Sequence, residues 1–103
     1  MRSPTATILG AGAMGTAIST ILSANGYKVC FWDIEKEVIE GINQKRRNPR
    51  SFPDLKLPDA VSAEADIRKA VFGADLVVVA VASSAVREVV KKIKDVLARN
   101  CLV

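Results

Sequence analysis

Short apolar runs alternate along this chain with segments in which apolar residues recur every three to four positions. The short runs predict buried strands, because a parallel strand covered on both faces is apolar throughout. We expect strands over Thr5–Leu9, Lys28–Trp32 and Leu76–Val81, with a shorter one over Val61–Ala63. A further strand is predicted to begin at Cys101–Val103.

The segments of helical periodicity predict helices over Ala13–Ala24, Glu35–Gln44 and Asp66–Phe72, and one more after Ser83 or Ser84, either of which can cap it. Apolar residues at helical spacing should face the core. In the first helix they are Ala17, Ile18, Ile21 and Leu22. In the last helix they are Val86, Val89, Val90, Ile93, Val96 and Leu97.

Strands that alternate with helices predict an α/β fold of the Rossmann type, a doubly wound parallel sheet in one small domain over residues 1–103. Ligands of such sheets bind at the carboxyl ends of the strands, where the winding direction reverses. The binding site should therefore lie between Gly10–Gly15 and the segment after Val81. The basic, proline-rich stretch Lys45–Pro58 is expected to be an ordered surface loop.

The segment Gly10–Gly15 joins the first predicted strand to the first predicted helix, and its glycines have the spacing GxGxxG of dinucleotide sites. Gly10 permits a sharp turn, Gly12 lets a pyrophosphate approach the backbone, and Gly15 lets the helix pack close to the strand. The free N–H groups and positive dipole end of the helix then face the phosphates. The alternative is a glycine-rich turn without a ligand.

Asp33 stands at the end of the second predicted strand, 18 residues after Gly15. A carboxylate there can accept hydrogen bonds from both hydroxyls of an adenosine ribose and would repel a 2′-phosphate, which favours NAD over NADP. The alternative is that Asp33 caps the helix that follows it, and both roles can hold together.

Several other polar and apolar residues allow two interpretations. A basic cluster is either a solvated part of the loop or a contact for an adenosine phosphate; its members are Lys45, Arg46, Arg47 and Arg50. Ser83 and Ser84 can donate hydrogen bonds to a coenzyme or only cap a helix. Met14 can lie against the nicotinamide end or be structural, and Trp32 is expected to pack beside the adenine.

Composition removes several classes of function. The net charge of +4, from 15 basic and 11 acidic residues, is mild, and aromatic residues make up only 5%, which argues against a base-stacking nucleic-acid surface. No apolar run approaches the ~20 residues that span a membrane, and no signal peptide is evident. Cys30 and Cys101 lie in predicted strands and are expected to be reduced core residues of a cytoplasmic protein. The chain has no histidine, and nothing indicates a metal site.

Beyond the glycine motif, the chain resembles the N-terminal coenzyme-binding domain of NAD(P)-dependent glycerol-3-phosphate dehydrogenase. The resemblance rests on segments spread over nearly the whole chain: Ile8–Ala17, Asn25-Gly26, Trp32, Ile42-Asn43, Asn48, Phe52-Pro53, Leu57-Pro58 and Ala74-Asp75. The spacing of Trp32, Ile42-Asn43, Asn48 and Leu57-Pro58 is more specific than the glycine motif, which fits many dehydrogenases.

The resemblance implies that NAD, with NADP possible, contacts the glycine segment and the position two beyond Trp32, which is Ile34. Ile34 can pack on adenine but cannot bind a 2′-phosphate. Family members usually have proline after the central strand, where this chain has Ala82. The candidate coenzyme-binding residues are therefore Gly10, Ala11, Gly12, Ala13, Met14, Gly15, Asp33, Ile34, Ala82 and Ser83.

The resemblance also implies a complete enzyme that interconverts glycerol 3-phosphate and dihydroxyacetone phosphate. Its catalytic lysine would follow the strand that begins at Cys101, and its helical substrate domain would follow later. We expect this chain to be a truncated coenzyme domain without catalytic residues, and its exposed sheet edge to favour a homodimer. The alternatives are a pyrroline-carboxylate or ketopantoate reductase, and a nucleotide-sensing module without catalysis.

Overall fold

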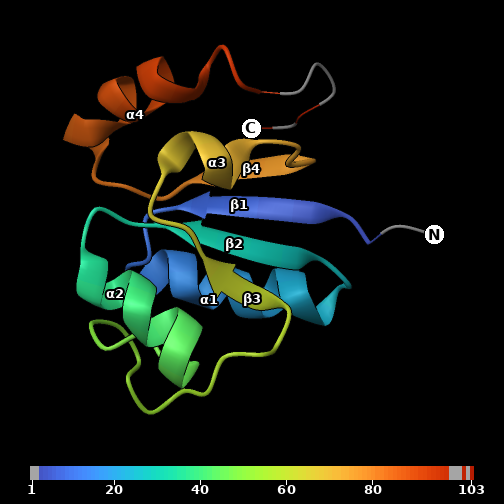
Figure 1. Cartoon of the computed structure of the whole chain (residues 1–103), viewed down its shortest axis with the longest axis vertical. Helices are drawn as coiled ribbons and strands as arrows, with labels where there is room; N and C mark the ends of the chain where they lie inside the picture. The colour runs from blue at the N-terminus through green and yellow to red at the C-terminus, as the bar shows by residue number, and fades with distance from the viewer. Residues whose placement is uncertain (1–2, 98–100, 102) are drawn as a thin grey trace.

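The computed structural model describes residues 3–97, 101 and 103 and contains one parallel sheet of four strands (Figure 1). The strands are β1 (Thr5–Leu9), β2 (Lys28–Trp32), β3 (Val61–Ala63) and β4 (Leu76–Val79). Their order is β3-β2-β1-β4, so that β1 lies inside the sheet and the chain crosses over between β3 and β4. This order confirms the predicted doubly wound α/β fold.

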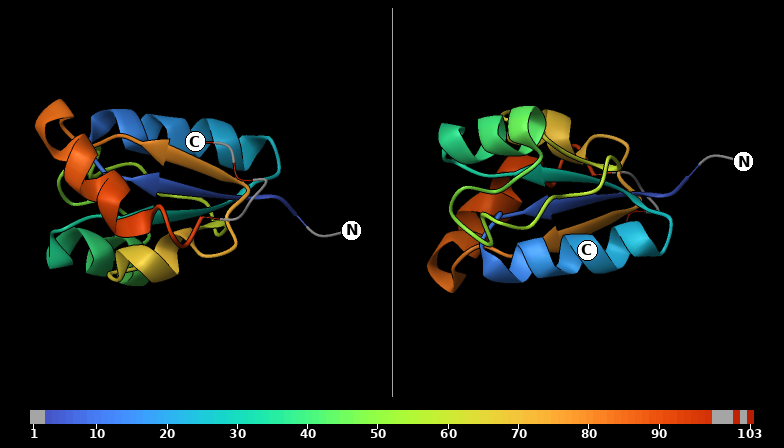
Figure 2. Two further views of the ribbon diagram at one scale, coloured as in Figure 1. Left: turned by 90° about the horizontal axis from the view of Figure 1, so that it is seen from above. Right: turned by 90° about the horizontal axis from the view of Figure 1, so that it is seen from below.

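The first helix has the predicted bounds, and the other three lie at the predicted positions but are shorter. They are α1 (Ala13–Ala24), α2 (Lys36–Glu40), α3 (Ile67–Val71) and α4 (Val86–Ile93). Figure 2 shows α1 and α3 on opposite faces of the sheet. α1 packs in one apolar cluster with Val38 and Ile42, whereas α3 packs with α4 in the other, so the crossover from β3 to β4 changes the face that the helices cover.

The second predicted helix, Glu35–Gln44, is present in two parts. The α-helical turns of α2 end at Glu40, and a π-helical turn continues over Gly41–Lys45. Arg46 ends this turn in the left-handed conformation, at φ 58°. Close packing requires a glycine at position 41, because a Cβ there would lie 2.6 Å from Pro49 Cδ.

The predicted core stripe of α1 is partly wrong. Ile18 and Leu22 are half-buried, but Ala17 and Ile21 are exposed, whereas Thr16 and Ser19 are fully buried. The cause is the close approach of α1 to the sheet. Gly15 faces β1 so closely that a Cβ there would overlap the carbonyl oxygen of Gly10. Only small residues fit along this line of contact, and the larger ones are displaced to its flank.

Two apolar clusters form the core, one for each face of the sheet. The first joins Ile8 of β1 and Phe31 of β2 to Val38 and Ile42 from the α2 segment, with Ile18 of α1 packed against them. The second joins Leu9 and Val77 to Ile67 of α3 and Val89 of α4. Successive residues of β1 therefore enter different clusters, as expected for a strand buried on both faces.

The last part of the chain departs most from prediction. β4 ends at Val79 rather than Val81, because its partner β1 ends at Leu9. Val96 and Leu97 pack against the second cluster as predicted, but they follow α4 rather than belonging to it. Neither Cys101 nor Val103 lies in a strand, and the predicted strand position Leu102 lies outside the described residues.

Asp66 and the two serines differ in their roles at helix starts. The Asp66 carboxylate accepts hydrogen bonds from the N–H groups of Arg68 and Lys69 and so caps α3. The capping role predicted for Ser83 or Ser84 is wrong. These residues form a 3₁₀ turn over Ser83–Ala85, and no side-chain hydrogen bond caps the start of α4 within the described structure.

Asp66→Ala should lower the free energy of unfolding by about 1 kcal/mol, because two N–H groups of α3 lose their acceptor. Ser84→Ala is the matched control and should leave it unchanged within experimental error. Urea unfolding followed by circular dichroism measures both. Equal effects of the two substitutions would contradict the capping role of Asp66.

Candidate functional site

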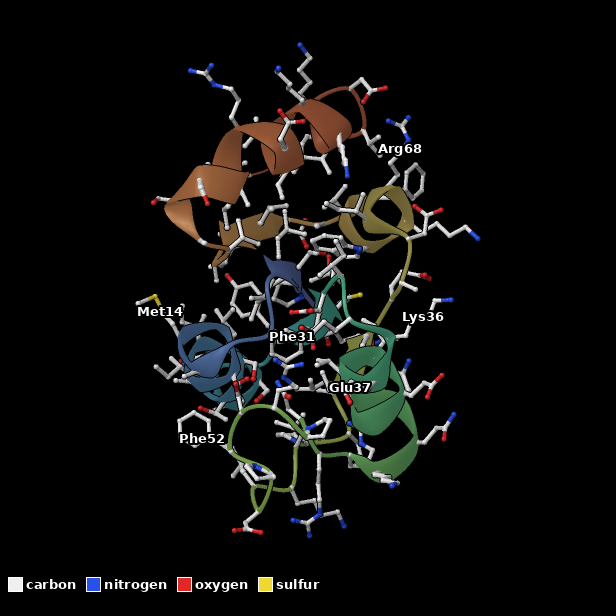
Figure 3. All side chains as sticks on the ribbon, turned by 90° about the vertical axis from the view of Figure 1, so that its left-hand side faces the viewer. Met14, Phe31, Lys36, Glu37, Phe52 and Arg68 are labelled. Atoms are coloured by element: carbon white, nitrogen blue, oxygen red, sulfur yellow. The ribbon has the colours of Figure 1, made fainter. Side chains whose placement is uncertain are left out.

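The carboxyl ends of β1, β2 and β4 meet at one edge of the sheet, and Figure 3 views the molecule from the side at which β1 ends. The chain leaves β1 at Gly10, which has a φ of +110° and donates its N–H to the Trp32 carbonyl at 2.8 Å. It then enters α1, whose N-cap is Gly12. The GxGxxG segment therefore forms the strand–turn–helix joint that the sequence predicts.

The three glycines differ in what the folded chain requires of them. At Gly10 a Cβ would lie 2.7 Å from the Ala80 carbonyl oxygen, and at Gly15 it would overlap the Gly10 carbonyl. At Gly12 a Cβ would meet nothing within 4 Å, and its φ of −80° is open to any residue. The chain itself therefore explains two of the glycines and leaves Gly12 unexplained.

Two side chains distant in sequence hold the peptide groups of Ala11, and we call this arrangement the Asp33–Asn48 clamp. Ala11 donates its N–H to Asp33 Oδ2 at 2.9 Å. Its carbonyl accepts a hydrogen bond from Asn48 Nδ2 at 2.6 Å. The residue between the first two glycines is thus fixed on both sides by groups outside the glycine segment.

Asn48 is a fully buried polar residue whose hydrogen-bonding capacity is completely used. Besides the Ala11 carbonyl, its amide group donates to Thr16 Oγ1 at 3.3 Å. Its oxygen accepts from the N–H groups of Arg50 and Ser51, at 2.9 and 3.2 Å. Asn48 therefore ties three segments together, namely the glycine segment, α1 and the proline-rich loop.

Asp33 makes two backbone contacts that the sequence did not predict. In addition to the Ala11 N–H, its carboxylate accepts the N–H of Glu35 through Oδ1 at 3.0 Å. Glu35 is the N-cap of α2, so Asp33 braces the turn just before the helix instead of capping the helix itself. The same carboxylate thus organises both the glycine segment and the start of α2.

Two cavities lie on either side of the glycine segment. The first, called here the Arg50 cavity, has a volume of about 270 Å³ and is lined by Ala11, Gly12, Asp33, Glu35, Val38, Arg50 and Ser51. The second, called here the Trp32 cavity, has a volume of about 410 Å³; its lining residues include Gly10, Gly12, Trp32, Ile34, Ala82 and Lys92. Gly12 and Asp33 line both cavities.

Of the other predicted coenzyme-binding residues, some line the Trp32 cavity and the rest lie on the surface. Ile34 is 81% exposed and lines the Trp32 cavity together with Ala82. Met14 is 71% exposed and points away from the body of the molecule (Figure 3). Ala13 and Ser83 are exposed near this edge, but neither lines a cavity described here.

The basic cluster is split by the structure. The Arg46 guanidinium donates to the Pro58 carbonyl, and that of Arg47 donates to the Asp54 carbonyl at 2.8 Å, so both bind within their own loop. Arg50 instead turns toward α2. It forms ion pairs with Glu35 and with Glu37, the latter at 3.0 Å, while lining the Arg50 cavity.

The part that Asn48 takes in this edge was not predicted from the sequence, in which Asn48 was singled out only for the resemblance. Arg50 was considered for a coenzyme contact, but only as one of the four residues of the basic cluster. A buried asparagine gives no periodic signal, and two of its partners, Ala11 and Thr16, lie 37 and 32 positions before it in the chain.

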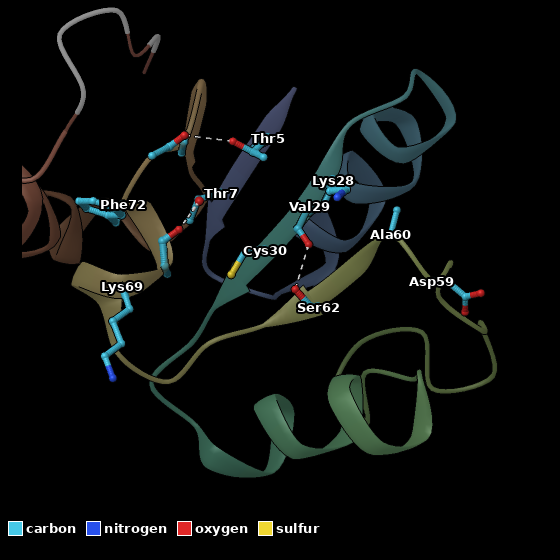
Figure 4. A pocket seen from close by; sticks show the side chains of 14 residues that line it. Thr5, Thr7, Lys28, Val29, Cys30, Asp59, Ala60, Ser62, Lys69 and Phe72 are labelled. Carbon is cyan, nitrogen blue, oxygen red and sulfur yellow. Dashed lines mark hydrogen bonds between the residues drawn. The ribbon is translucent and has the colours of Figure 1, made fainter. Parts of the chain in front are cut away.

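A larger groove of about 730 Å³ lies away from this edge, beside the amino-terminal halves of β1 and β2 (Figure 4). It is lined by residues that include Thr5, Cys30, Ser62, Lys69 and Phe72. Burial, followed by the charge of Glu64, raises the pKa of Cys30 to about 11. The thiol is therefore protonated at neutral pH and is a poor nucleophile.

The described residues contain no group of three or more His, Cys, Asp or Glu side chains able to hold a metal ion. Within the same part of the chain, no helix is long and apolar enough to cross a membrane.

The family model described as "NAD-dependent glycerol-3-phosphate dehydrogenase N-terminus" matches residues 5–103. The chain belongs to this family. A glycerol-3-phosphate dehydrogenase [NAD(P)+] from Anaeromyxobacter dehalogenans is 47% identical over 89 residues, which are 86% of this chain and 27% of the relative. One from Clostridium acetobutylicum is 40% identical over 97 residues, covering 94% of this chain and 29% of the relative. The chain thus spans less than a third of the length of these glycerol-3-phosphate dehydrogenases.

Solved structures of glycerol-3-phosphate dehydrogenases have the same fold. The enzyme from Coxiella burnetii superposes with a TM-score of 0.87 at 27% identity, over 96% of this chain and 30% of its own. The enzyme from Plasmodium falciparum gives a TM-score of 0.84 at 27% identity, also over 96% of this chain and 30% of its own. These similarities confirm the resemblance and the Rossmann-type fold of this glycerol-3-phosphate dehydrogenase domain.

Asn48→Ala should lower the free energy of unfolding by about 3 kcal/mol, because it leaves the buried Ala11 carbonyl and the Arg50 and Ser51 N–H groups without partners. Asn43→Ala is the matched control. Asn43 also bonds a backbone, that of Ala63, but in an exposed position, so its loss should cost about 1 kcal/mol or less. Denaturant unfolding compares the two, and equal losses would contradict the special role of Asn48.

Proposed function

We propose that this chain is the coenzyme-binding domain of a glycerol-3-phosphate dehydrogenase and that it binds NAD across the glycine segment, with NADP as the weaker ligand. The observation that carries the proposal is Gly12. Nothing in the folded chain requires a glycine there, since a Cβ would enter open space. A ligand that approaches the backbone at this point supplies the missing reason.

The residues present fit such a ligand. Gly12 is the N-cap of α1, a helix of 12 residues whose first N–H groups have no acceptor within the helix. These N–H groups and the positive end of the helix dipole favour a pyrophosphate. Gly12 lines both the Arg50 cavity and the Trp32 cavity, so the two halves of a dinucleotide can enter separate cavities from this point. Among the predicted contacts, we assign Ala11, Ala13 and Met14 to the loop, and Ile34, Ala82 and Ser83 to its surroundings.

Asp33 supports the preference for NAD. An ionised carboxylate has about four lone-pair sites, and backbone N–H groups occupy two of those on Asp33. The others can accept hydrogen bonds from ribose hydroxyls, and the negative charge disfavours a 2′-phosphate. We therefore infer that Asp33 both holds the loop and binds the ribose.

For the complete protein we propose the interconversion of glycerol 3-phosphate and dihydroxyacetone phosphate. The bound coenzyme would supply hydride transfer to and from its nicotinamide ring. In this chain the glycine segment and Asp33 hold and orient the coenzyme, and we assign no catalytic role to the described residues. We assign the substrate site and the catalytic lysine to a part of the protein outside residues 1–103, and we infer a cytoplasmic location.

The alternatives carry less support. A match of the dehydrogenase family model over residues 5–103 favours this family over the pyrroline-carboxylate and ketopantoate reductases, although a ketopantoate reductase from Ralstonia eutropha has a similar fold. A nucleotide-sensing module without catalysis stays an alternative for the chain in isolation. The homodimer also stays a prediction, motivated by the outer edge of β4 and the exposed Ile21; sedimentation of the full-length protein tests it.

Gly12→Ala should leave the free energy of unfolding almost unchanged, because the new methyl group enters open space. It should weaken NADH binding by about tenfold or more, since the methyl group occupies the approach of the pyrophosphate. Titration of the full-length protein, followed by NADH fluorescence, measures the affinity. Gly15→Ala is the contrast and should destabilise the fold itself. Unchanged NADH affinity in a folded Gly12→Ala protein would refute the proposed function.

Asp33→Ala tests the ribose contact separately from the support of the loop. Loss of hydrogen bonds to a charged acceptor should weaken NADH binding about tenfold more than NADPH binding. Asn43→Ala is the control, because its hydrogen bonds to Ala63 lie outside both cavities beside Gly12, so its loss should leave both affinities unchanged. If Asp33→Ala weakened both coenzymes equally, Asp33 would only position the glycine segment.

A further inference from the structure

The Arg50 cavity is lined both by Asp33, whose carboxylate is proposed to bind the ribose, and by Arg50, whose guanidinium carries a positive charge. Ala11 and Gly12 of the glycine segment line this cavity together with Asp33, which follows β2. Arg50 and Ser51 reach it from the proline-rich loop. A group attached to the 2′ position of a ribose bound at Asp33 would therefore enter the neighbourhood of Arg50.

The position of Arg50 in this cavity is fixed through its backbone. Its N–H donates to the oxygen of the fully buried Asn48 at 2.9 Å, and Asn48 in turn holds the Ala11 carbonyl. The side chain is 55% exposed and ends between two acidic residues of the α2 segment. It can turn while its backbone stays in place.

The guanidinium of Arg50 forms ion pairs with Glu35 and Glu37 in this structure. One nitrogen, Arg50 Nη1, contacts a carboxylate oxygen of each, and Glu35 itself lines the cavity. The hydrogen bond to Glu37, followed by the charge of Glu35, raises the pKa of Arg50, so the group is permanently charged.

We propose that Arg50 is the residue of this chain that recognises a 2′-phosphate, and that Glu35 and Glu37 set the preference for NAD by competing with that phosphate for Arg50. This inference rests on the proposed function, because it concerns the coenzyme bound at Asp33. It assigns coenzyme preference to an ion-pair network in addition to the single carboxylate at the end of β2.

The charges around the cavity explain the direction of the preference. Asp33, Glu35 and Glu37 carry three negative charges against the one positive charge of Arg50, so a doubly charged phosphate meets net repulsion. A guanidinium can bind phosphate through two parallel N–H groups, but only after it leaves the glutamates. The other arginines of the loop, Arg46 and Arg47, donate to backbone carbonyls of their own loop. Ile34, at the same edge, has no charge to offer.

The test measures the dissociation constants of NADH and NADPH by fluorescence titration of the full-length protein. The double variant Glu35→Gln/Glu37→Gln keeps the shape of both side chains but removes their charges. We expect its NADPH affinity to rise about tenfold relative to its NADH affinity. Adding Arg50→Ala to the double variant should abolish this gain, because the phosphate then has no guanidinium to bind.

Asp95→Asn provides the matched control. Asp95 holds Arg68 through two contacts of 2.8 and 3.1 Å, an equally exposed ion pair whose residues do not line either cavity beside Gly12. Loss of this ion pair should leave the ratio of the NADH and NADPH dissociation constants unchanged. The ratio reports on selectivity alone, so a general loss of stability would not imitate the effect.

Two results would overturn the inference. In the first, the ratio of the NADH and NADPH dissociation constants is the same in the double variant as in the unmodified protein, so the glutamates do not control coenzyme preference. In the second, the gain for NADPH persists after Arg50→Ala, so the effect is one of general charge and not of recognition by Arg50. Failure of the unmodified protein to bind either coenzyme would refute the proposed function instead.

Discussion

The site depends on the two hydrogen bonds that hold the peptide groups of Ala11. The Asp33–Asn48 clamp fixes this residue at the point where the chain turns from β1 into α1. A glycine-rich turn would otherwise have many accessible conformations, and ordering it at the moment of binding would weaken the affinity for any ligand. Here the order is already present in the folded chain, and the two residues that provide it come from β2 and the proline-rich loop.

Burial makes the two halves of the clamp unequal. Asn48 is 1% exposed and uses all its hydrogen-bonding capacity within the chain, so it serves the structure alone. Asp33 is half-buried and faces both cavities beside Gly12. One side chain of the pair is therefore dedicated to support, whereas the other combines support with contact to whatever enters the cavities. A substitution at Asp33 consequently affects two properties that only selectivity measurements can separate.

The sequence predicted the elements whose signals are local. Apolar runs located all four strands to within two residues, and the spacing of Gly10, Gly12 and Gly15 located the strand–turn–helix joint. The signals were weaker wherever distant segments decide the outcome. The approach of α1 to β1 pushed Ile21 to the surface against its helical pattern. The contacts of Asn48 with Ala11 and Thr16, and the turn of Arg50 toward α2, are tertiary contacts that leave no periodic trace in the chain.

The origin of the clamp limits what a short motif can transfer. The bend at Ala11 needs a carboxylate at the end of the neighbouring strand and a buried amide from a loop that follows 37 residues later in the chain. Grafting the hexapeptide Gly10–Gly15 alone onto another strand–helix junction would carry over the glycines without the groups that shape them. A designer who wants this bend in a new protein has to transplant β2 and the Asn48 loop with it.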